Sequence, residues 1–219
     1  DRYASRGLGD VYKRQHYHVA HVSTKEAVDV IRHAKKRGLK ITCDTAPPYF
    51  CLNETILSSY DTAFKLSPPL RTEDDRLAII EAIKDGTIDA IASDHRSRSK
   101  DTKIQPFSAA SVGATGIETL FLLTLELVQK NIISLNKAIS MITINPAKLL
   151  KLNKPELQED KDATFFIFKD KMIDKINQKE FKNSPTPFDG RVVTAKVVRT
   201  FIKGNCSYIH ELLHEKIIK

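Results

Sequence analysis

The sequence lacks tryptophan, and its 219 residues contain only three cysteines and two methionines. The cysteines, Cys43, Cys51 and Cys206, are odd in number and lack the paired spacing of a zinc-binding motif. They argue against a disulfide framework and favour a reduced, cytoplasmic compartment. Long apolar runs are also missing, since none reaches about 18 residues. Because the start of the chain has no secretory signal pattern either, we expect neither a membrane span nor secretion.

The balance of charges does not point to a nucleic acid partner. The net charge is +8, from 35 Lys and Arg residues against 27 Asp and Glu residues, and such an excess suits nucleic acid or an anionic substrate. The basic residues are spread over predicted helix faces and the C-terminal tail, with no basic run interleaved with aromatics. We therefore interpret the charge as solvated. A hydrophobic content of 41% supports a sizeable core, in one domain or one and a half.

The order of apolar runs and amphipathic segments predicts an α/β fold. Strand-like runs occur at residues 17–23, 39–43, 63–66 and 88–92. Helices are predicted between them, one opened by a capping box at Ser23 and one by Thr72. Their expected buried residues are Ala27, Val30, Ile31 and Ala34 in the first helix and Leu77, Ile80 and Ile83 in the second. Such alternation is typical of a parallel sheet with right-handed crossovers.

The stretch 88–101 organises the predicted fold. Its apolar run ends in Ser93, Asp94 and His95, and α/β barrels carry their chemistry at the carboxyl ends of their strands. An isolated Asp in this place often only caps the following loop. The first predicted strand, however, also ends in a polar group, His21. Two such ends in one parallel sheet favour a functional site.

The remaining chain is predicted to continue with a long loop, three helices and a second group of strands. The loop covers residues 95–116, long enough to serve a function. Helices are expected at Ile117–Lys130, at Ser134–Thr143 and from Asn145, where Pro146 follows. After a charged linker, residues 153–161, strand-like runs follow at 163–168, 191–202 and 205–209.

A set of motifs in fixed order resembles the dihydroorotases among the cyclic amidohydrolases. The set is HVSTKE, PPLR, DR, IDAIASDH, GIET and NPAK, between about Tyr17 and Asn205. The resemblance implies the C-terminal half of a metal-dependent hydrolase of the TIM-type (β/α)8 barrel class, plus part of a small C-terminal β-sandwich. Residues 16–152 would hold the last four strand-helix units and the C-terminal barrel helices. Residues 162–210 would belong to a sandwich that family members build from both chain ends.

The two ends of the chain are expected to lie outside these domains. Residues 1–15 carry Gly, Arg and polar residues without a period, and DVYKRQ looks like translated adapter sequence, so we interpret them as non-native. Residues 211–219 are predicted to form a basic tail. The parent protein is then expected to have begun well upstream of Tyr17.

The resemblance implies interconversion of dihydroorotate and N-carbamoyl-aspartate in pyrimidine synthesis, with one or two zinc ions in the full-length parent. Hydrolysis of a cyclic amide near neutral pH needs a hydroxide and a polarised carbonyl, which such ions supply. His and Asp are suitable zinc ligands. His21 is accordingly expected to bind metal, and Asp94 to bind metal and act as general acid and base. For His18 we favour a packed, hydrogen-bonded histidine.

Three positions depart from the motifs of the family. Tyr49 stands where the family offers a second His ligand, and a phenol is a poor zinc ligand. We expect Tyr49 to face a polar cavity. Ser67 replaces the Asn before PPLR, and Arg98 replaces a substrate-binding His after Asp94. Ser67, His95 and Arg98 are therefore the candidate substrate contacts, and Arg98 is suited to grip a carboxylate bidentately.

These departures leave two other functions open. One is a non-catalytic dihydroorotase-like subunit that supports aspartate transcarbamoylase, which Tyr49, Ser67 and Arg98 favour. The other is a dihydropyrimidinase or allantoinase, which would share the metal residues. In each case we expect a homo-oligomeric parent that binds neither nucleic acid nor membrane. Because only His21 and Asp94 of the expected ligands are present, the 219 residues alone should lack a tight zinc site and hydrolytic activity.

Overall fold

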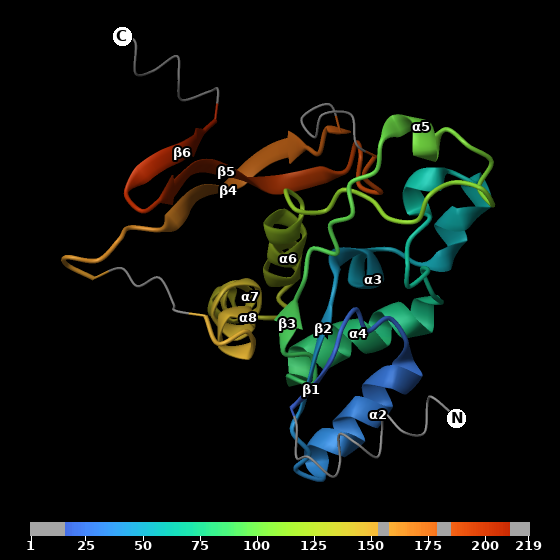
Figure 1. Cartoon of the computed structure of the whole chain (residues 1–219), viewed down its shortest axis with the longest axis horizontal. Coiled ribbons are helices and arrows are strands. Elements are labelled where there is room, and N and C mark those ends of the chain that lie inside the picture. The colour runs from blue at the N-terminus through green and yellow to red at the C-terminus, as the bar shows by residue number, and fades with distance from the viewer. Residues whose placement is uncertain (1–15, 153–157, 179–184, 211–219) are drawn as a thin grey trace.

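The computed structural model describes residues 16–152, 158–178 and 185–210, which form two sheets with helices around and between them (Figure 1). In this part of the chain the first sheet has three parallel strands in the order β1-β2-β3. They are β1 (Tyr17–Val19), β2 (Ile41–Thr45) and β3 (Ala90–Ile91). The central strand β2 pairs with both neighbours, so the carboxyl ends of all three strands lie along one edge.

Helices cover this parallel sheet and bury its apolar side chains. They are α2 (Lys25–Lys36), α4 (Glu73–Asp85), α6 (Leu120–Gln129), α7 (Leu135–Ile142) and α8 (Ile144–Leu149). Helices α2, α4, α6 and α7 share one core with the strands and with Ile88, which precedes β3. Its buried residues include Val28, Ile31, Cys43, Ile79, Ile83, Ile88, Ile91, Leu127 and Met141. Burial of so many branched side chains supplies the main stabilisation of this part of the fold.

The expected strand at residues 63–66 is wrong, and the described parallel sheet therefore has three strands where four were expected for 16–152. This region holds short helical turns, α3 (Pro47–Cys51), η1 (Glu54–Ser59) and η2 (Thr62–Phe64). The carboxylate of Asp61 accepts a hydrogen bond from the Ala63 amide at 2.8 Å and so opens η2. A side-chain cap thus outweighs the strand preference of a four-residue run.

Helix starts were predicted with mixed success. The Thr72 cap is confirmed: its hydroxyl accepts from the Asp75 amide and the Asp75 carboxylate accepts from the Thr72 amide, each at 3.2 Å. The capping box at Ser23 is wrong, because Thr24 caps α2 by accepting from the Ala27 amide at 3.2 Å. Ser23 is buried instead. Either hydroxyl of the Ser-Thr pair can cap a helix, and the neighbouring core decides which one does.

The predicted helix faces were also partly wrong. Val30 in α2 is 67% exposed and Leu77 in α4 is 47% exposed, while Val28 and Ile79 are buried in their place. Ile31 is buried as expected. Each helix carries more apolar residues than one narrow stripe holds, so the packing of α2 against α4 and β2 selects the buried stripe.

The later helices follow the prediction closely. Ser134 caps α7 by accepting from the Lys137 amide at 3.2 Å, as expected. The helix expected from Asn145 begins at Ile144, and Pro146 lies in its first turn. The loop 95–116 contains one short helix, α5 (Lys100–Lys103).

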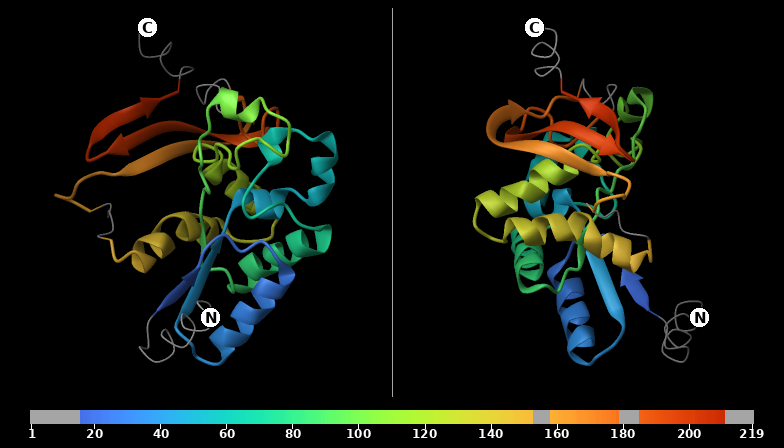
Figure 2. Two further views of the ribbon diagram at one scale, coloured as in Figure 1. Left: turned by 45° about the vertical axis from the view of Figure 1, so that its right-hand side comes forward. Right: turned by 90° about the vertical axis from the view of Figure 1, so that its left-hand side faces the viewer.

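The second sheet is antiparallel and lies beyond α6, away from α2, as both views in Figure 2 show. Its strands are β4 (Phe165–Lys175), β5 (Val192–Ile202) and β6 (Asn205–Ile209), in that order. The prediction found all three strands, but β4 runs beyond the expected residue 168. Parts of the linker (153–157), residues 1–15 and the tail 211–219 lie outside the described residues.

Aromatic, ionic and apolar contacts join α6 to this antiparallel sheet. The Phe121 ring meets Phe166 and Phe168 edge to face, with each pair of centroids 4.9 Å apart. The Arg191 guanidinium donates two hydrogen bonds of 2.8 Å to the Glu126 carboxylate. This pair lowers the pKa of Glu126 against the opposing effect of burial. The bidentate geometry fixes the start of β5 beside α6.

Gly116 allows the loop 95–116 to return against the end of the third strand. A Cβ at Gly116 would lie 2.5 Å from the Ser93 carbonyl oxygen, and the Gly116 amide donates to His95 Nδ1 at 3.3 Å. The approach needs a residue without a side chain at position 116. The glycine therefore helps to hold the segment that carries Asp94.

We expect Gly116→Ala to destabilise the protein by about 1–3 kcal/mol, because a methyl group must displace backbone rather than a flexible side chain. Gly38→Ala is the control, since its Cβ would meet open space and its left-handed backbone alone costs about 1 kcal/mol. Urea unfolding of both variants measures the difference. A Gly116→Ala variant no less stable than Gly38→Ala would contradict the close approach.

Candidate functional site

The candidate site lies at the carboxyl edge of the parallel sheet. His21 follows β1 and Asp94 follows β3, and both have a left-handed backbone, with φ of 56° and 45°. Residues other than glycine rarely adopt this conformation, and where they do the strain often marks a functional site. The structure thus brings together the two residues that the sequence singled out.

The reactive atoms of the two side chains face each other. His21 Nε2 lies 3.5 Å from Asp94 Oδ1, and the Asp94 side chain is only 6% exposed. Asp94 Oδ1 and His21 Nδ1 are buried without a hydrogen bond of acceptable geometry in the described structure. Two ligands of one tetrahedral zinc ion lie about 3.4 Å apart at the usual bond lengths. This separation and the unsatisfied carboxylate oxygen fit a metal ion.

The described residues supply only part of such a metal site. Within them, no three His, Cys, Asp or Glu side chains are arranged to hold an ion. Zinc usually takes three or four ligands from the protein. His21 and Asp94 fit as two of them.

Asp44 is a site residue that the sequence reasoning missed. It lies in β2, next to the carboxyl end, and its Oδ1 accepts from the His21 amide at 2.8 Å and lies 3.2 Å from His21 Nδ1. Its Oδ2 accepts from His18 Nε2 at 2.9 Å. The available signal was a carboxylate near the end of a predicted strand, in the run KITCDT.

Asp44 and His21 alter each other's pKa. Burial by itself would raise the pKa of Asp44, but hydrogen bonds from His21 and His18 outweigh it and lower that pKa. The Asp44 side chain raises the pKa of His21 against the opposing effect of burial, with Asp94 adding to the rise. An ionised carboxylate beside the imidazole is therefore the stable arrangement in the chain without metal.

Tyr49 does not face a polar cavity, and that expectation was wrong. The side chain is buried in an apolar cluster, and the residue is 3% exposed. Its hydroxyl lies 3.0 Å from the Pro68 carbonyl oxygen and 3.3 Å from Asp94 Oδ2, and its one proton is shared between these two acceptors. Burial, with the nearby Asp94 charge, raises the pKa of the phenol, so it remains a hydrogen-bond donor. Tyr49 thus holds one oxygen of Asp94, while the other, Oδ1, makes no hydrogen bond and has only the Arg96 and His21 side chains beside it.

The predicted substrate contacts lie around Asp94 but are not all directed at it. Arg98 is exposed, and its Nε donates to the Val112 carbonyl at 2.8 Å. His95 is exposed, and its Nδ1 accepts a hydrogen bond from the Gly116 amide at the other end of the same loop. Ser67 is exposed beside Pro68. The guanidinium nearest to the carboxylate is that of Arg96, whose Nε lies 3.2 Å from Asp94 Oδ1.

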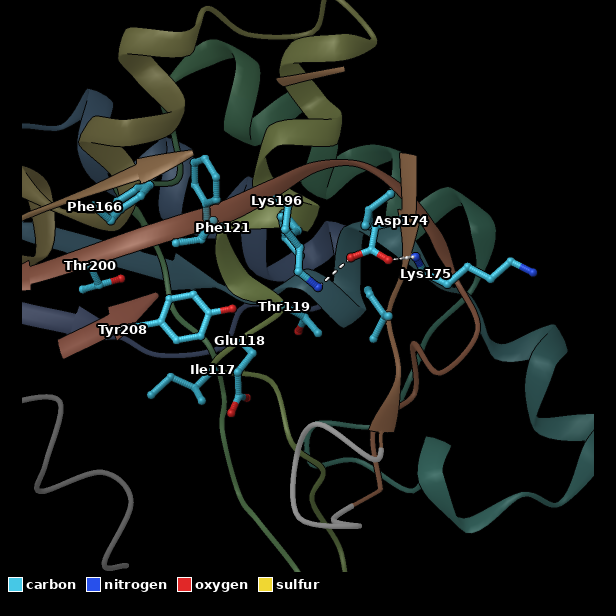
Figure 3. Close-up of a pocket in the computed structure, with 14 residues that line it drawn as sticks. Ile117, Glu118, Thr119, Phe121, Phe166, Asp174, Lys175, Lys196, Thr200 and Tyr208 are labelled. Carbon is cyan, nitrogen blue, oxygen red and sulfur yellow. Dashed lines mark hydrogen bonds and ion pairs between the residues drawn. The ribbon is translucent and has the colours of Figure 1, made fainter. Parts of the chain in front are cut away.

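A wide groove lies elsewhere, between α6 and the antiparallel sheet (Figure 3). Its volume is about 520 Å³, and its wall is mostly apolar with one ion pair, Lys196 to Asp174 at 2.6 Å. The groove contains neither His21 nor Asp94. Its size reflects an uncovered apolar surface rather than the reactive centre.

Removing the Tyr49 hydroxyl tests its hold on Asp94. Tyr49→Phe should cost about 1 kcal/mol, the net value of a buried hydrogen bond. Tyr49→His should cost more, on the order of 2 kcal/mol, because a polar ring replaces a larger apolar one in a packed cluster. Tyr60→Phe is the control, since Tyr60 is 74% exposed. Equal urea midpoints for Tyr49→Phe and Tyr60→Phe would show that the hydroxyl contributes nothing.

No helix among the described residues is long and apolar enough to cross a membrane.

The chain is similar in sequence to dihydroorotases of several bacteria. The chain is 40% identical over 195 residues to a dihydroorotase of Anaplasma phagocytophilum, covering 88% of this chain and 44% of that protein. It is 40% identical over 197 residues to a dihydroorotase of Desulforapulum autotrophicum, covering 89% of this chain and 46% of that protein. The chain thus spans about half the length of the curated relatives it matches.

Solved structures share the fold. The L-hydantoinase (dihydropyrimidinase) from Arthrobacter aurescens superposes with a TM-score of 0.83 at 26% identity, over 91% of this chain and 46% of that one. Dihydropyrimidinase from Brevibacillus agri gives 0.82 at 26% identity, over 90% of this chain and 45% of that one. The sequence pattern of the amidohydrolase family matches residues 1–206. The chain therefore belongs to the amidohydrolase family.

Proposed function

We propose that the protein to which this chain belongs is a metal-dependent cyclic amidohydrolase of the dihydroorotase type. Its reaction would be the interconversion of dihydroorotate and N-carbamoyl-aspartate. The observation that carries the proposal is the convergence of His21 Nε2 and Asp94 Oδ1, 3.5 Å apart at the sheet edge. The dihydroorotase relatives at 40% identity support this substrate over other cyclic amides.

In this mechanism one or two zinc ions would activate water and polarise the amide carbonyl. His21 and Asp94 would be two of the ligands. Asp94 would also take a proton from the attacking water and deliver it to the leaving ring nitrogen. Tyr49 would keep Asp94 in place through Oδ2, so that Oδ1 remains directed towards His21. The buried position of the carboxylate would keep bulk water from competing for its hydrogen bonds.

We infer that residues 16–152 are the C-terminal part of a (β/α)8 barrel and that residues 162–210 belong to a composite β-sandwich. In the described part, β1 and β3 are sheet edges, and open parallel edges favour aggregation unless they are paired. The relatives are about twice as long as the match. An upstream half would pair these edges, supply the missing metal ligands and cover the groove beside α6.

Substrate binding would use Arg98, His95 and Ser67, with Arg96 as an additional group. The product of ring opening carries two carboxylates, and a guanidinium is the best partner for such a group. Both arginines are on the loop after Asp94. Arg96 already lies 3.2 Å from Asp94 Oδ1, and Arg98 would have to leave the Val112 carbonyl to contact a ligand there.

Arg98→Ala is predicted to raise KM by about 10- to 100-fold, with a smaller effect on kcat, if the contact contributes about 1.5–3 kcal/mol. Lys100→Ala is the control, since Lys100 is an exposed cation on the same loop. Steady-state kinetics of the full-length enzyme give both parameters. Unchanged kinetics in Arg98→Ala, together with a raised KM in Arg96→Ala, would transfer the carboxylate contact to Arg96.

Two other functions each have an observation in their favour. The buried Tyr49 and the incomplete ligand set suit a non-catalytic subunit that supports aspartate transcarbamoylase. The similarity to hydantoinase and dihydropyrimidinase structures suits a hydrolase of that type. In all three cases we expect a homo-oligomer. The three free cysteines support a cytoplasmic location.

The full-length protein, with an upstream half, decides between these functions. We expect it to retain zinc after dialysis and to hydrolyse dihydroorotate faster than dihydrouracil, hydantoin or allantoin. The 219 residues alone should retain no zinc at micromolar free metal, because they supply two ligands. Zinc-free, inactive protein that co-purifies with aspartate transcarbamoylase would establish the scaffold function. Preference for dihydrouracil would establish the dihydropyrimidinase type.

A further inference from the structure

We propose that Asp44 is a positioning residue that fixes the ring of His21 for metal binding, and that His18 holds Asp44 in that role. The inference rests on the proposed metal-dependent function. Asp44 and His18 would orient His21 without touching the metal or the substrate themselves.

Asp44 holds both the backbone and the ring of His21. One oxygen, Oδ1, accepts from the His21 amide at 2.8 Å and lies 3.2 Å from the ring nitrogen Nδ1. The first contact stabilises the left-handed backbone of His21, with φ of 56°. The second places a carboxylate beside one ring nitrogen and leaves Nε2 directed at Asp94 Oδ1, 3.5 Å away. Backbone and ring are thus set by the same side chain.

The carboxylate supports one tautomer of metal-bound His21. His21 Nδ1 lies 3.2 Å from Asp44 Oδ1, outside hydrogen-bond geometry but beside an acceptor. A metal ion bound at Nε2 needs the lone pair of that nitrogen, so the ring proton is then on Nδ1, where the carboxylate accepts it. Metal-binding histidines usually donate their other N–H to a carboxylate or carbonyl in this way, and loss of that partner typically weakens metal affinity by about 10- to 100-fold.

A second set of contacts keeps Asp44 in place. His18 Nε2 donates to Asp44 Oδ2 at 2.9 Å, and His18 Nδ1 lies 2.8 Å from the Thr42 hydroxyl. With neutral His18, the Thr42 hydroxyl donates to Nδ1, because Nε2 already carries the proton. Asp44 is only 12% exposed on its side chain, so it has little water to replace these partners. Oδ1 of Asp44 therefore contacts His21 and Oδ2 contacts His18.

Asp89 offers a matched control for Asp44. It too is a carboxylate beside β2, accepting from the Cys43 amide at 2.8 Å and from Lys35 Nζ at 2.6 Å. It has no contact with His21 or Asp94 among the interactions of the described residues. Asp→Asn at either position removes a charge and weakens a backbone contact, but only Asp44 faces the imidazole.

The test uses the full-length protein, with zinc affinity measured by competition with a chelator. Asp44→Asn should bind zinc about 10- to 100-fold more weakly than wild type, whereas Asp89→Asn should match wild type. In the zinc-loaded protein, the His21 Nδ1 proton should give an NMR signal that exchanges slowly with water, and Asp44→Asn should make that exchange faster. Asp44→Asn that binds zinc as tightly as Asp89→Asn, with unchanged exchange of the His21 Nδ1 proton, would overturn the inference.

A second variant covers the case in which Asp44→Asn fails to fold. His18→Gln leaves Asp44 and its contacts to His21 in place and removes one support, so zinc affinity should fall by a smaller factor, roughly threefold to tenfold. Unchanged affinity in this variant would then overturn the inference. A wild-type protein that retains no zinc would instead refute the proposed function. Zinc-dependent hydrolysis with unaffected Asp44→Asn would refute only the role of Asp44.

Discussion

The pairing of β2 with strands on both sides is the constraint on which the candidate site depends. His21 and Asp94 are far apart in the sequence, and they meet only because β1 and β3 align in parallel with the same central strand. Parallel pairing places all three carboxyl ends along one edge. The side chains that follow those ends are then held within a few ångströms of one another by backbone hydrogen bonds.

The stability of the core beneath that edge compensates for unfavourable conformations of the site residues. Left-handed backbone at two residues other than glycine costs on the order of 1–3 kcal/mol each, and a buried polar atom without a partner costs a similar amount. His21 and Asp94 carry both features. The branched side chains packed between the strands and α2, α4, α6 and α7 offset this cost. A site of this kind exists only on a rigid support.

Much of this arrangement could be predicted from local patterns. The carboxyl ends carrying His21 and Asp94, and the caps Thr72 and Ser134, are encoded within a few residues of sequence. Local patterns also placed the three strands of the antiparallel sheet, although β4 is longer than expected, because alternating apolar residues rarely suit any other element.

Other features depend on contacts that no local pattern contains. Val30 and Val28 suit the core equally well by composition, and only the packing of α2 against its neighbours decides that Val28 is buried. Tyr49 is buried because distant residues, Leu66 and Leu70, close over it. Asp44 has an ordinary strand context, and its importance depends on which residues of β1 lie beside it. Partners across a sheet are what the sequence alone leaves open.

Helix α6 has a consequence for how the whole molecule unfolds. Leu127 belongs to the core under the parallel sheet, whereas Leu123 packs with Val193 and Phe188 beside the antiparallel one. A helix buried on two sides cannot keep its shape when either layer opens. We therefore expect the two sheets of the described structure to unfold in one cooperative transition. Damage to the antiparallel sheet, remote from His21 and Asp94, would then reach them by melting the helix between.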